Sequence, residues 1–168
     1  MHRKWRITLA LGLTLAVACS DHADPGPHRP SPLSGTLELA GLLLECAPLA
    51  HDSAAAVFGP AGGTLAIGPH RLVIPSGALA DTVTITGVVL TATAVNAVHF
   101  EPHGLRFASP ATVSLAYGNC DLPLMGAVRV ARTDDTFAIL EYLPSRDEKS
   151  TQTVTGVLKH FSNYAVAW

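Results

Sequence analysis

The fold is decided by residues 59–90, which read GPAGGTLAIGPHRLVIPSGALADTVTITGVVL. Glycine and proline divide this stretch into short apolar runs, because Gly62-Gly63, Gly68-Pro69 and Pro75-Ser76-Gly77 are typical turn sequences. From residue 82 onward, threonine alternates with valine and isoleucine, which is the period of a strand with one buried face. The stretch therefore predicts strand, turn, strand, turn, strand.

The same stretch carries a resemblance to a known family. Its order GGTL, LVIPSGAL and TVTIT is similar to the opening of the ZU-five domain, the β-sandwich module named for zonula occludens proteins and the Unc-five netrin receptors. It resembles even more closely a group of small bacterial lipoproteins that carry a domain of that type, over residues 46–168. The resemblance implies a β-sandwich that acts as a protein-interaction or scaffold element.

The composition favours one β-rich domain. A chain of 168 residues with 48% hydrophobic content can bury one sizeable core, and its 14% of charged residues is below the usual share of about a quarter. Threonine, valine, glycine and proline are frequent, which disfavours helix. Because no basic stripe with interleaved aromatic residues is present, we expect no nucleic-acid partner.

The N-terminus has the pattern of a bacterial lipoprotein signal. Residues 1–6 are basic, residues 7–17 are apolar but too few to span a bilayer, and small residues stand directly before Cys19. We therefore expect residues 1–18 to be a signal peptide and Cys19 to receive the lipid, with Ser20 indicating the outer membrane. The alternative is an ordinary secretory peptide whose removal leaves a free thiol.

The remaining chain divides into a tether and a folded domain. Residues 19–35 are rich in proline and predict a disordered tether to a domain at residues 36–168. Within that domain, residues 36–50 suit either an edge strand or a short helical turn, and residues 144–149 suggest a charged loop. The other segments alternate between turn signals and short apolar runs. They predict an all-β, two-sheet antiparallel β-sandwich of about eight strands with little helix.

Histidines are the first candidates for a metal site. His99 and His103 have the spacing H-x-x-x-H, and His51, His70 and His160 add to the number. Zinc favours such a pair on one face of a helix with a third ligand nearby. A proline and a glycine beside His103 exclude a regular helix. We therefore expect turn or surface histidines, and we predict no metal and no other cofactor.

Motifs for catalysis on a diffusible substrate are absent from the sequence. It contains no G-x-S-x-G, and the glycines of residues 59–63 precede a strand without the lysine of a phosphate-binding loop. Ser76 lies in a predicted turn. We therefore expect a protein that is not an enzyme. The alternative is an envelope hydrolase with a composite site built from scattered loops, which a broad hydrolase screen would reveal.

One motif allows a reaction within the chain itself. His160-Phe161-Ser162 matches the H-F-S sequence at which some ZU-five-containing proteins cleave themselves. In that chemistry the Ser162 hydroxyl attacks the carbonyl of Phe161, with His160 as general base. The sequence shows neither a strained peptide bond nor a donor for the oxyanion. We predict an intact chain, with self-cleavage between Phe161 and Ser162 as the alternative.

Cys46 and Cys120 remain once Cys19 is assigned to the lipid. In an oxidising compartment such a pair first suggests a disulfide, and the alternative is two separately buried thiols. Together these features predict a lipid-anchored β-sandwich of the bacterial cell envelope. We expect a monomeric, non-catalytic module that is held at the membrane through Cys19 and meets an envelope protein partner.

Overall fold

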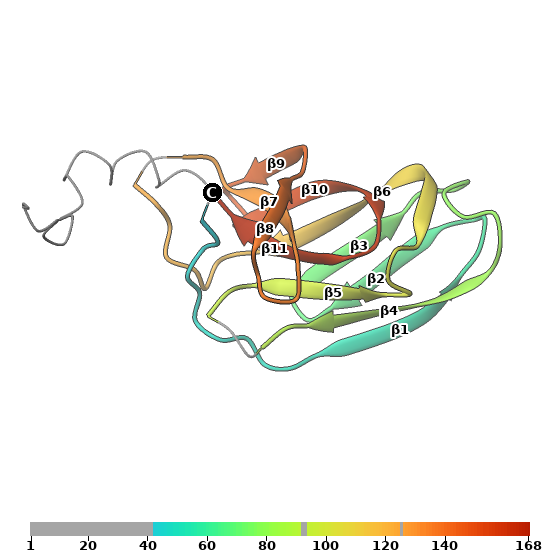
Figure 1. Ribbon diagram of the computed structural model, residues 1–168, viewed down its shortest axis with the longest axis horizontal. Coiled ribbons are helices and arrows are strands. Elements are labelled where there is room, and N and C mark those ends of the chain that lie inside the picture. Colours follow the sequence, from blue (N-terminus) through green and yellow to red (C-terminus); the bar gives the residue numbers. More distant parts are fainter. Residues whose placement is uncertain (1–41, 92–93, 125) are drawn as a thin grey trace, which may run out of the picture. The chain divides into compact units, whose positions relative to one another are not determined.

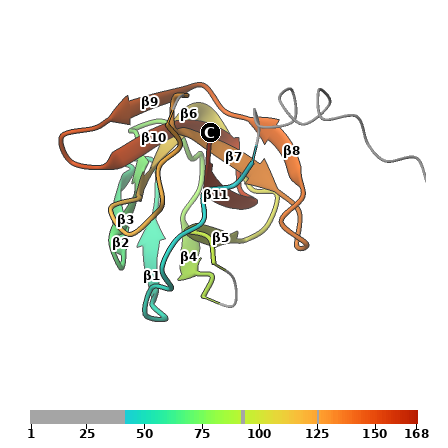
Figure 2. The ribbon, with the colours of Figure 1, turned by 90° about the vertical axis from the view of Figure 1, so that its left-hand side faces the viewer.

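The computed structural model of the protein describes residues 42–91, 94–124 and 126–168. The predicted signal peptide, the predicted lipidation site Cys19 and the predicted tether at residues 19–35 lie outside these residues. The described part is all β, with two antiparallel sheets packed against each other (Figures 1 and 2). The prediction of a two-sheet antiparallel β-sandwich is therefore confirmed. None of the described residues belongs to a helix of the length and apolarity that crossing a bilayer requires.

The described residues form eleven strands, where the sequence predicted about eight. They are β1 (Ser53–Phe58), β2 (Gly63–Ile67), β3 (His70–Ile74), β4 (Val83–Val89), β5 (Ala97–Glu101), β6 (Arg106–Ala116), β7 (Arg129–Thr133), β8 (Ile139–Tyr142), β9 (Ser145–Glu148), β10 (Thr153–His160) and β11 (Asn163–Ala167). The six-stranded sheet has the order β1-β4-β5-β11-β7-β8, and the five-stranded sheet has the order β2-β3-β6-β10-β9. The last strand of the chain thus lies inside the six-stranded sheet, between β5 and β7.

Residues 59–90 fold as predicted, into β2, β3 and β4 with turns between them. The turn before β2 requires glycine at position 62, because its φ is 70° and a Cβ there would lie 2.2 Å from the carbonyl oxygen of Ile74. In β4, Ile85 and Val89 are buried in the core, whereas Thr84 is exposed. The alternation of threonine with aliphatic residues therefore marks the two faces of this strand.

Aromatic side chains fill one part of the core between the sheets. The ring of Phe161 lies 5.0 Å from that of Phe100, nearly parallel to it, and 5.0 Å from that of Phe107, edge to face. Tyr164 adds a tilted contact with Phe100 at 6.3 Å. Three of these four side chains are fully buried, and such ring pairs stabilise a core beyond the area they remove from water.

The two sheets lie very close together where β10 packs against β7. Gly156 of β10 faces Val130, and a Cβ at position 156 would lie 2.7 Å from the Cβ of Val130. No side chain other than hydrogen fits at that distance without a shift of one strand.

The structure contains two strands that the sequence did not predict, β9 and β1. Residues 144–149 were expected to form a charged loop, but they contain β9, which pairs with β10 at the edge of the five-stranded sheet. Charged residues suit this position, because an edge strand needs protection against pairing with other chains. The other missing strand is β1, whose sequence SAAAVF contains three alanines and so has little strand propensity of its own.

Residues 42–50, which we call the strap, form neither the predicted edge strand nor a helical turn. The strap runs along one end of the sandwich and makes two isolated bridges, Leu43 with Ala167 and Cys46 with Cys120. The same two cysteines are also joined by a disulfide, with their sulfur atoms 2.05 Å apart. The predicted disulfide is therefore confirmed.

Candidate functional site

The candidate site is built on one transverse row of residues in the six-stranded sheet. The strand registers place Val88 of β4 opposite His99 of β5, His99 opposite Asn163 of β11, and Asn163 opposite Thr133 of β7. Residues directly opposite each other in antiparallel strands project to the same side. Their neighbours along the strands, such as Val98, pack in the core. The row therefore lies on the face of the sheet that is turned away from the core.

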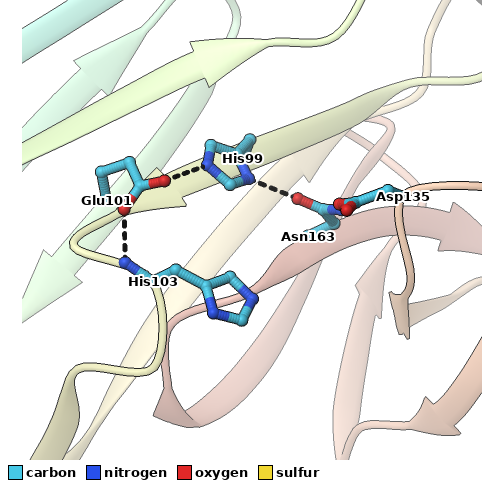
Figure 3. Close-up of polar contacts among 5 residues, drawn as sticks. All are labelled: His99, Glu101, His103, Asp135 and Asn163. Carbon is cyan, nitrogen blue, oxygen red and sulfur yellow. Dashed lines mark hydrogen bonds and ion pairs between the residues drawn. The ribbon is translucent and has the colours of Figure 1, made fainter.

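Four side chains on this face form a chain of hydrogen bonds (Figure 3). Glu101 Oε1 lies 2.8 Å from His99 Nε2, and His99 Nδ1 lies 2.5 Å from Asn163 Oδ1. Asn163 Nδ2 in turn donates to Asp135 Oδ1 at 2.9 Å. The four residues come from β5, β11 and the turn after β7, so this chain joins three segments that are distant in the sequence.

The hydrogen bonds determine the protonation of His99. Because the Asp135 carboxylate only accepts, Asn163 must direct its amide nitrogen to Asp135 and its oxygen to His99. Both ring nitrogens of His99 then face acceptors, and only the imidazolium donates from both. Partial burial lowers the pKa of His99, but the bonds to Asn163 and Glu101 and the nearby negative charges outweigh it, so the net shift is upward.

Glu101 has a second partner in this arrangement. Its Oε2 accepts the backbone N–H of His103 at 2.5 Å, which holds the turn after β5. The hydrogen bonds from His99 and from the His103 backbone lower the pKa of Glu101. Glu101 is therefore kept as the anion that the His99 imidazolium requires.

The turn at residues 134–138 holds Asp135 over the sheet. Asp134 Oδ1 accepts the backbone N–H of Thr136 at 2.8 Å, the hydroxyl of Thr136 at 2.7 Å and the N–H of Ala138 at 2.9 Å. These bonds, led by that from the Thr136 hydroxyl, lower the pKa of Asp134. In the same turn Phe137 has a φ of 65°, a conformation that costs a non-glycine residue about 1–3 kcal/mol.

A pocket of about 370 Å³ lies beside this turn, and we call it the outer pocket. Its lining combines aliphatic, aromatic and polar side chains, and consists of His51, Val88, Val89, Leu90, Thr91, His99, Asp135, Phe137 and Asn163. A mostly apolar hollow with a few convergent polar groups is the usual form of a small-molecule site.

The five histidines singled out from the sequence lie in different parts of the fold. His99 and His103 lie in β5 and in the turn after it, with their rings nearly parallel and 6.3 Å apart. His51 lines the outer pocket. Among residues 42–91, 94–124 and 126–168, no group of three or more His, Cys, Asp or Glu side chains is arranged to hold a metal ion.

His70 lies elsewhere, buried at the start of β3. Its Nδ1 accepts the backbone N–H of Ala116 at 3.2 Å, and only 1% of the residue is exposed. Burial lowers the pKa of His70 to about 4. It is therefore a neutral core histidine at physiological pH, and the expectation of a turn or surface histidine was wrong for this residue.

The self-cleavage motif lies in the bend between β10 and β11. The carbonyl oxygen of Phe161 accepts the N–H of Gly104 at 3.1 Å, and Nδ1 of His160 lies 3.2 Å from the same oxygen. Phe161 and Ser162 are buried. His160 uses its Nδ1 at this carbonyl, and within the described residues it makes no hydrogen bond to the hydroxyl of Ser162.

The sequence matches no protein-family model and no curated protein. The resemblance to ZU-five-like lipoproteins therefore stays a prediction. The site rests on geometry alone, and Glu101, Asp135, Phe137 and Asn163 were not identified from the sequence. The available signal was weak: a polar residue at the start of an apolar last strand, and two adjacent aspartates in a hairpin turn.

Proposed function

We propose that this protein is a lipid-anchored β-sandwich of the bacterial cell envelope that binds another envelope component without catalysis. In this proposal it is one of the ZU-five-like lipoproteins that it resembles. The binding face is the outer pocket with the hydrogen-bonded chain beside it.

The hydrogen bonding of both ring nitrogens of His99 is the observation that favours binding over catalysis. A general base needs a ring nitrogen with a free lone pair within reach of the substrate. Both nitrogens of His99 instead donate to acceptors, Asn163 and Glu101. The role that this geometry supports is structural: His99 fixes the side chain of Asn163, which in turn fixes Asp135 beside the pocket.

The disulfide supports export. Disulfides such as Cys46–Cys120 persist in oxidising compartments and are rare in the reducing cytosol. An exported chain with a lipid at Cys19 would be attached to the membrane on the N-terminal side of the strap. This arrangement agrees with the proposed envelope location.

Site-specific photo-crosslinking in the native envelope tests the proposal. A photoreactive amino acid would replace His103, which is exposed beside the site, and in the control Ala66, which is exposed on the other sheet. We expect a defined adduct from position 103 that is absent from position 66 and lost when Phe137→Gly is added. If position 103 gives no adduct, or if purified protein turns over substrates in a hydrolase screen, the proposal is wrong.

Self-cleavage at Phe161–Ser162 is the second candidate, because two groups already contact the carbonyl oxygen that would become the oxyanion. These are the Gly104 N–H and His160 Nδ1. We still expect an intact chain, since His160 is engaged at the carbonyl and not at the attacking hydroxyl. Denaturing intact-mass analysis distinguishes the two: a species without residues 162–168 that disappears in Ser162→Ala would establish cleavage.

A further inference from the structure

The outer pocket offers hydrogen-bond donors and acceptors together. One hydrogen of the Asn163 amide is not used by Asp135, and the second carboxylate oxygen of Asp135 is not used by Asn163. The hydroxyl of Thr91 and the ring of His51 add groups of both kinds. A ligand that matches this lining must both donate and accept hydrogen bonds.

The pocket lining brings a positive and a negative group together, His99 and Asp135, whereas Glu101 is paired with His99 and is not part of the lining. The imidazolium of His99 stands between two carboxylates, with Glu101 bonded to it directly and Asp135 bonded through Asn163. An ammonium ligand near Asp135 would also approach the His99 cation, and an anionic ligand near His99 would approach Asp135. The site therefore favours a ligand without net charge.

The remaining lining is apolar and includes one strained aromatic residue. Val88 and Leu90 line one part of the pocket, and Phe137 contributes an aromatic ring. Phe137 keeps a positive φ of 65°, which bulky residues rarely adopt. Such strain persists only where the surrounding structure imposes it, and ligand sites are among the places where it is common.

We infer that the outer pocket binds a neutral saccharide ring, with hydroxyl groups bonded to Asp135 and Asn163 and a C–H face against Phe137. This inference rests on the proposed binding function and names its ligand class. Sugar hydroxyls both donate and accept, and a pyranose combines them with an apolar face, so it matches each part of the lining. A purely apolar ligand would leave the polar groups of Asp135 and Asn163 unsatisfied.

Direct binding measurements test the inference on the mature chain with Cys19→Ser, which removes the lipid and keeps the rest. An array of neutral glycans is screened first, and hits are titrated by calorimetry. The charged probes are benzylamine and benzoate. We expect saturable binding of at least one neutral glycoside, and weaker or no binding of both charged probes.

Two glycine variants at positions with a positive φ distinguish the loss of the Phe137 ring from a change in backbone conformation. Phe137→Gly removes the ring and suits the positive φ, so we expect a folded protein that binds roughly tenfold or more weakly. Gln152→Gly is the control, because Gln152 has a φ of 50° in another turn, and its binding should equal that of the wild type. Phe137→Asn, which also tolerates this conformation, replaces Phe137→Gly if that variant does not fold. Asp135→Ala should weaken binding as well.

Three results would overturn the inference: no neutral glycan bound above background, a charged probe bound more tightly than any glycoside, or unchanged affinity in Phe137→Gly. The crosslinking experiment at position 103 tests the proposed binding function independently of the saccharide. An adduct that forms in a protein without glycan binding would leave the binding function standing and refute the saccharide. If neither the adduct nor glycan binding is observed, the binding function and the saccharide ligand are both refuted.

Discussion

Among single residues, His99 has a charge state that depends on its hydrogen-bond partners. Its upward pKa shift means that the folded protein holds the proton more tightly than the unfolded chain. The resulting stabilisation is complete below the unfolded pKa of about 6.5 and is lost as the pH rises through the pKa of His99 in the folded state. The hydrogen-bonded chain on the sheet is therefore most stable in mildly acidic conditions.

Ring-nitrogen NMR across a pH titration tests this charge state. We expect His99 to stay doubly protonated above its ordinary pKa, and we expect Glu101→Gln to lower its pKa because a charged acceptor becomes a neutral amide. Glu148→Gln is the matched control, since Glu148 pairs with Arg146 at 3.6 Å elsewhere on the surface. A single proton on the His99 ring in mildly acidic solution would contradict the assignment.

His70 has the opposite effect on stability. Its folded pKa of about 4 lies below the unfolded value, so the unfolded chain binds a proton more readily between those values. Stability should fall by roughly 3 kcal/mol as the pH decreases from about 6.5 to about 4. Urea unfolding at several pH values measures this loss. In His70→Asn, whose amide oxygen can replace Nδ1 as acceptor for Ala116, the acid-induced loss should be smaller by that amount; an equal loss would refute the assignment to His70.

At the scale of elements, the contact between β10 and β7 makes position 156 intolerant of side chains. Gly156→Ala should destabilise the protein by about 1–3 kcal/mol, because its methyl group would overlap Val130. The double variant Gly156→Ala with Val130→Ala should lose less than the sum of the two single losses, since Val130→Ala keeps the Cβ but removes the Cγ atoms that would lie 2.9 and 3.1 Å from the added methyl. Denaturant unfolding gives all three values. Strict additivity would mean that the two positions do not share this space.

The strap contributes to stability through its covalent bond. The bond between Cys46 and Cys120 spans 74 residues, and in the chain-entropy model a loop of that size stabilises by roughly 4 kcal/mol. The double variant Cys46→Ser with Cys120→Ser should lose about that amount in denaturant unfolding. Thiol counting under denaturing, non-reducing conditions checks the premise. Two free thiols in protein purified from the envelope would contradict it.

Local sequence was sufficient to predict those strands whose hydrophobic alternation and flanking turns lie within the segment itself. The threonine alternation and the glycine turns of residues 59–90 predicted β2, β3 and β4 because each depends on the chain within a few residues. Strands β1 and β9 were missed because alanine-rich and charged segments become strands only through their partners β4 and β10.

The candidate site was predictable only in part, for a related reason. His99 and His103 were recognisable as candidates, but the partners of His99 were not. Asn163 stands 64 positions further along the chain, and only the registers of β5, β11 and β7 bring it beside His99 and place Asp135 above it. Phe137 gave no signal, because a positive φ at phenylalanine runs against its sequence preference.

For the whole molecule, the decisive question is its attachment to the membrane. We expect Cys19 to carry a diacylglyceryl group, because small residues and a short apolar run precede it. The wild type should incorporate labelled palmitate and sediment with membranes, whereas Cys19→Ser should do neither. Cys46→Ser is the control, since it removes a cysteine and keeps the anchor. Full membrane association of Cys19→Ser would disprove the assignment.

The strap also determines how the protein would respond to a pulling force. Tension that enters from the N-terminal side reaches Cys46 before it reaches β1, an edge strand that could be peeled from β4. The disulfide diverts that load to Cys120, just beyond β6, the longest strand of the sandwich. Because the disulfide joins the two ends of residues 46–120, tension that passes from the N-terminal side to residues beyond Cys120, such as Asp135 and Asn163, would bypass β1 and β4. An anchored protein that holds a ligand would therefore keep the outer pocket in shape under shear.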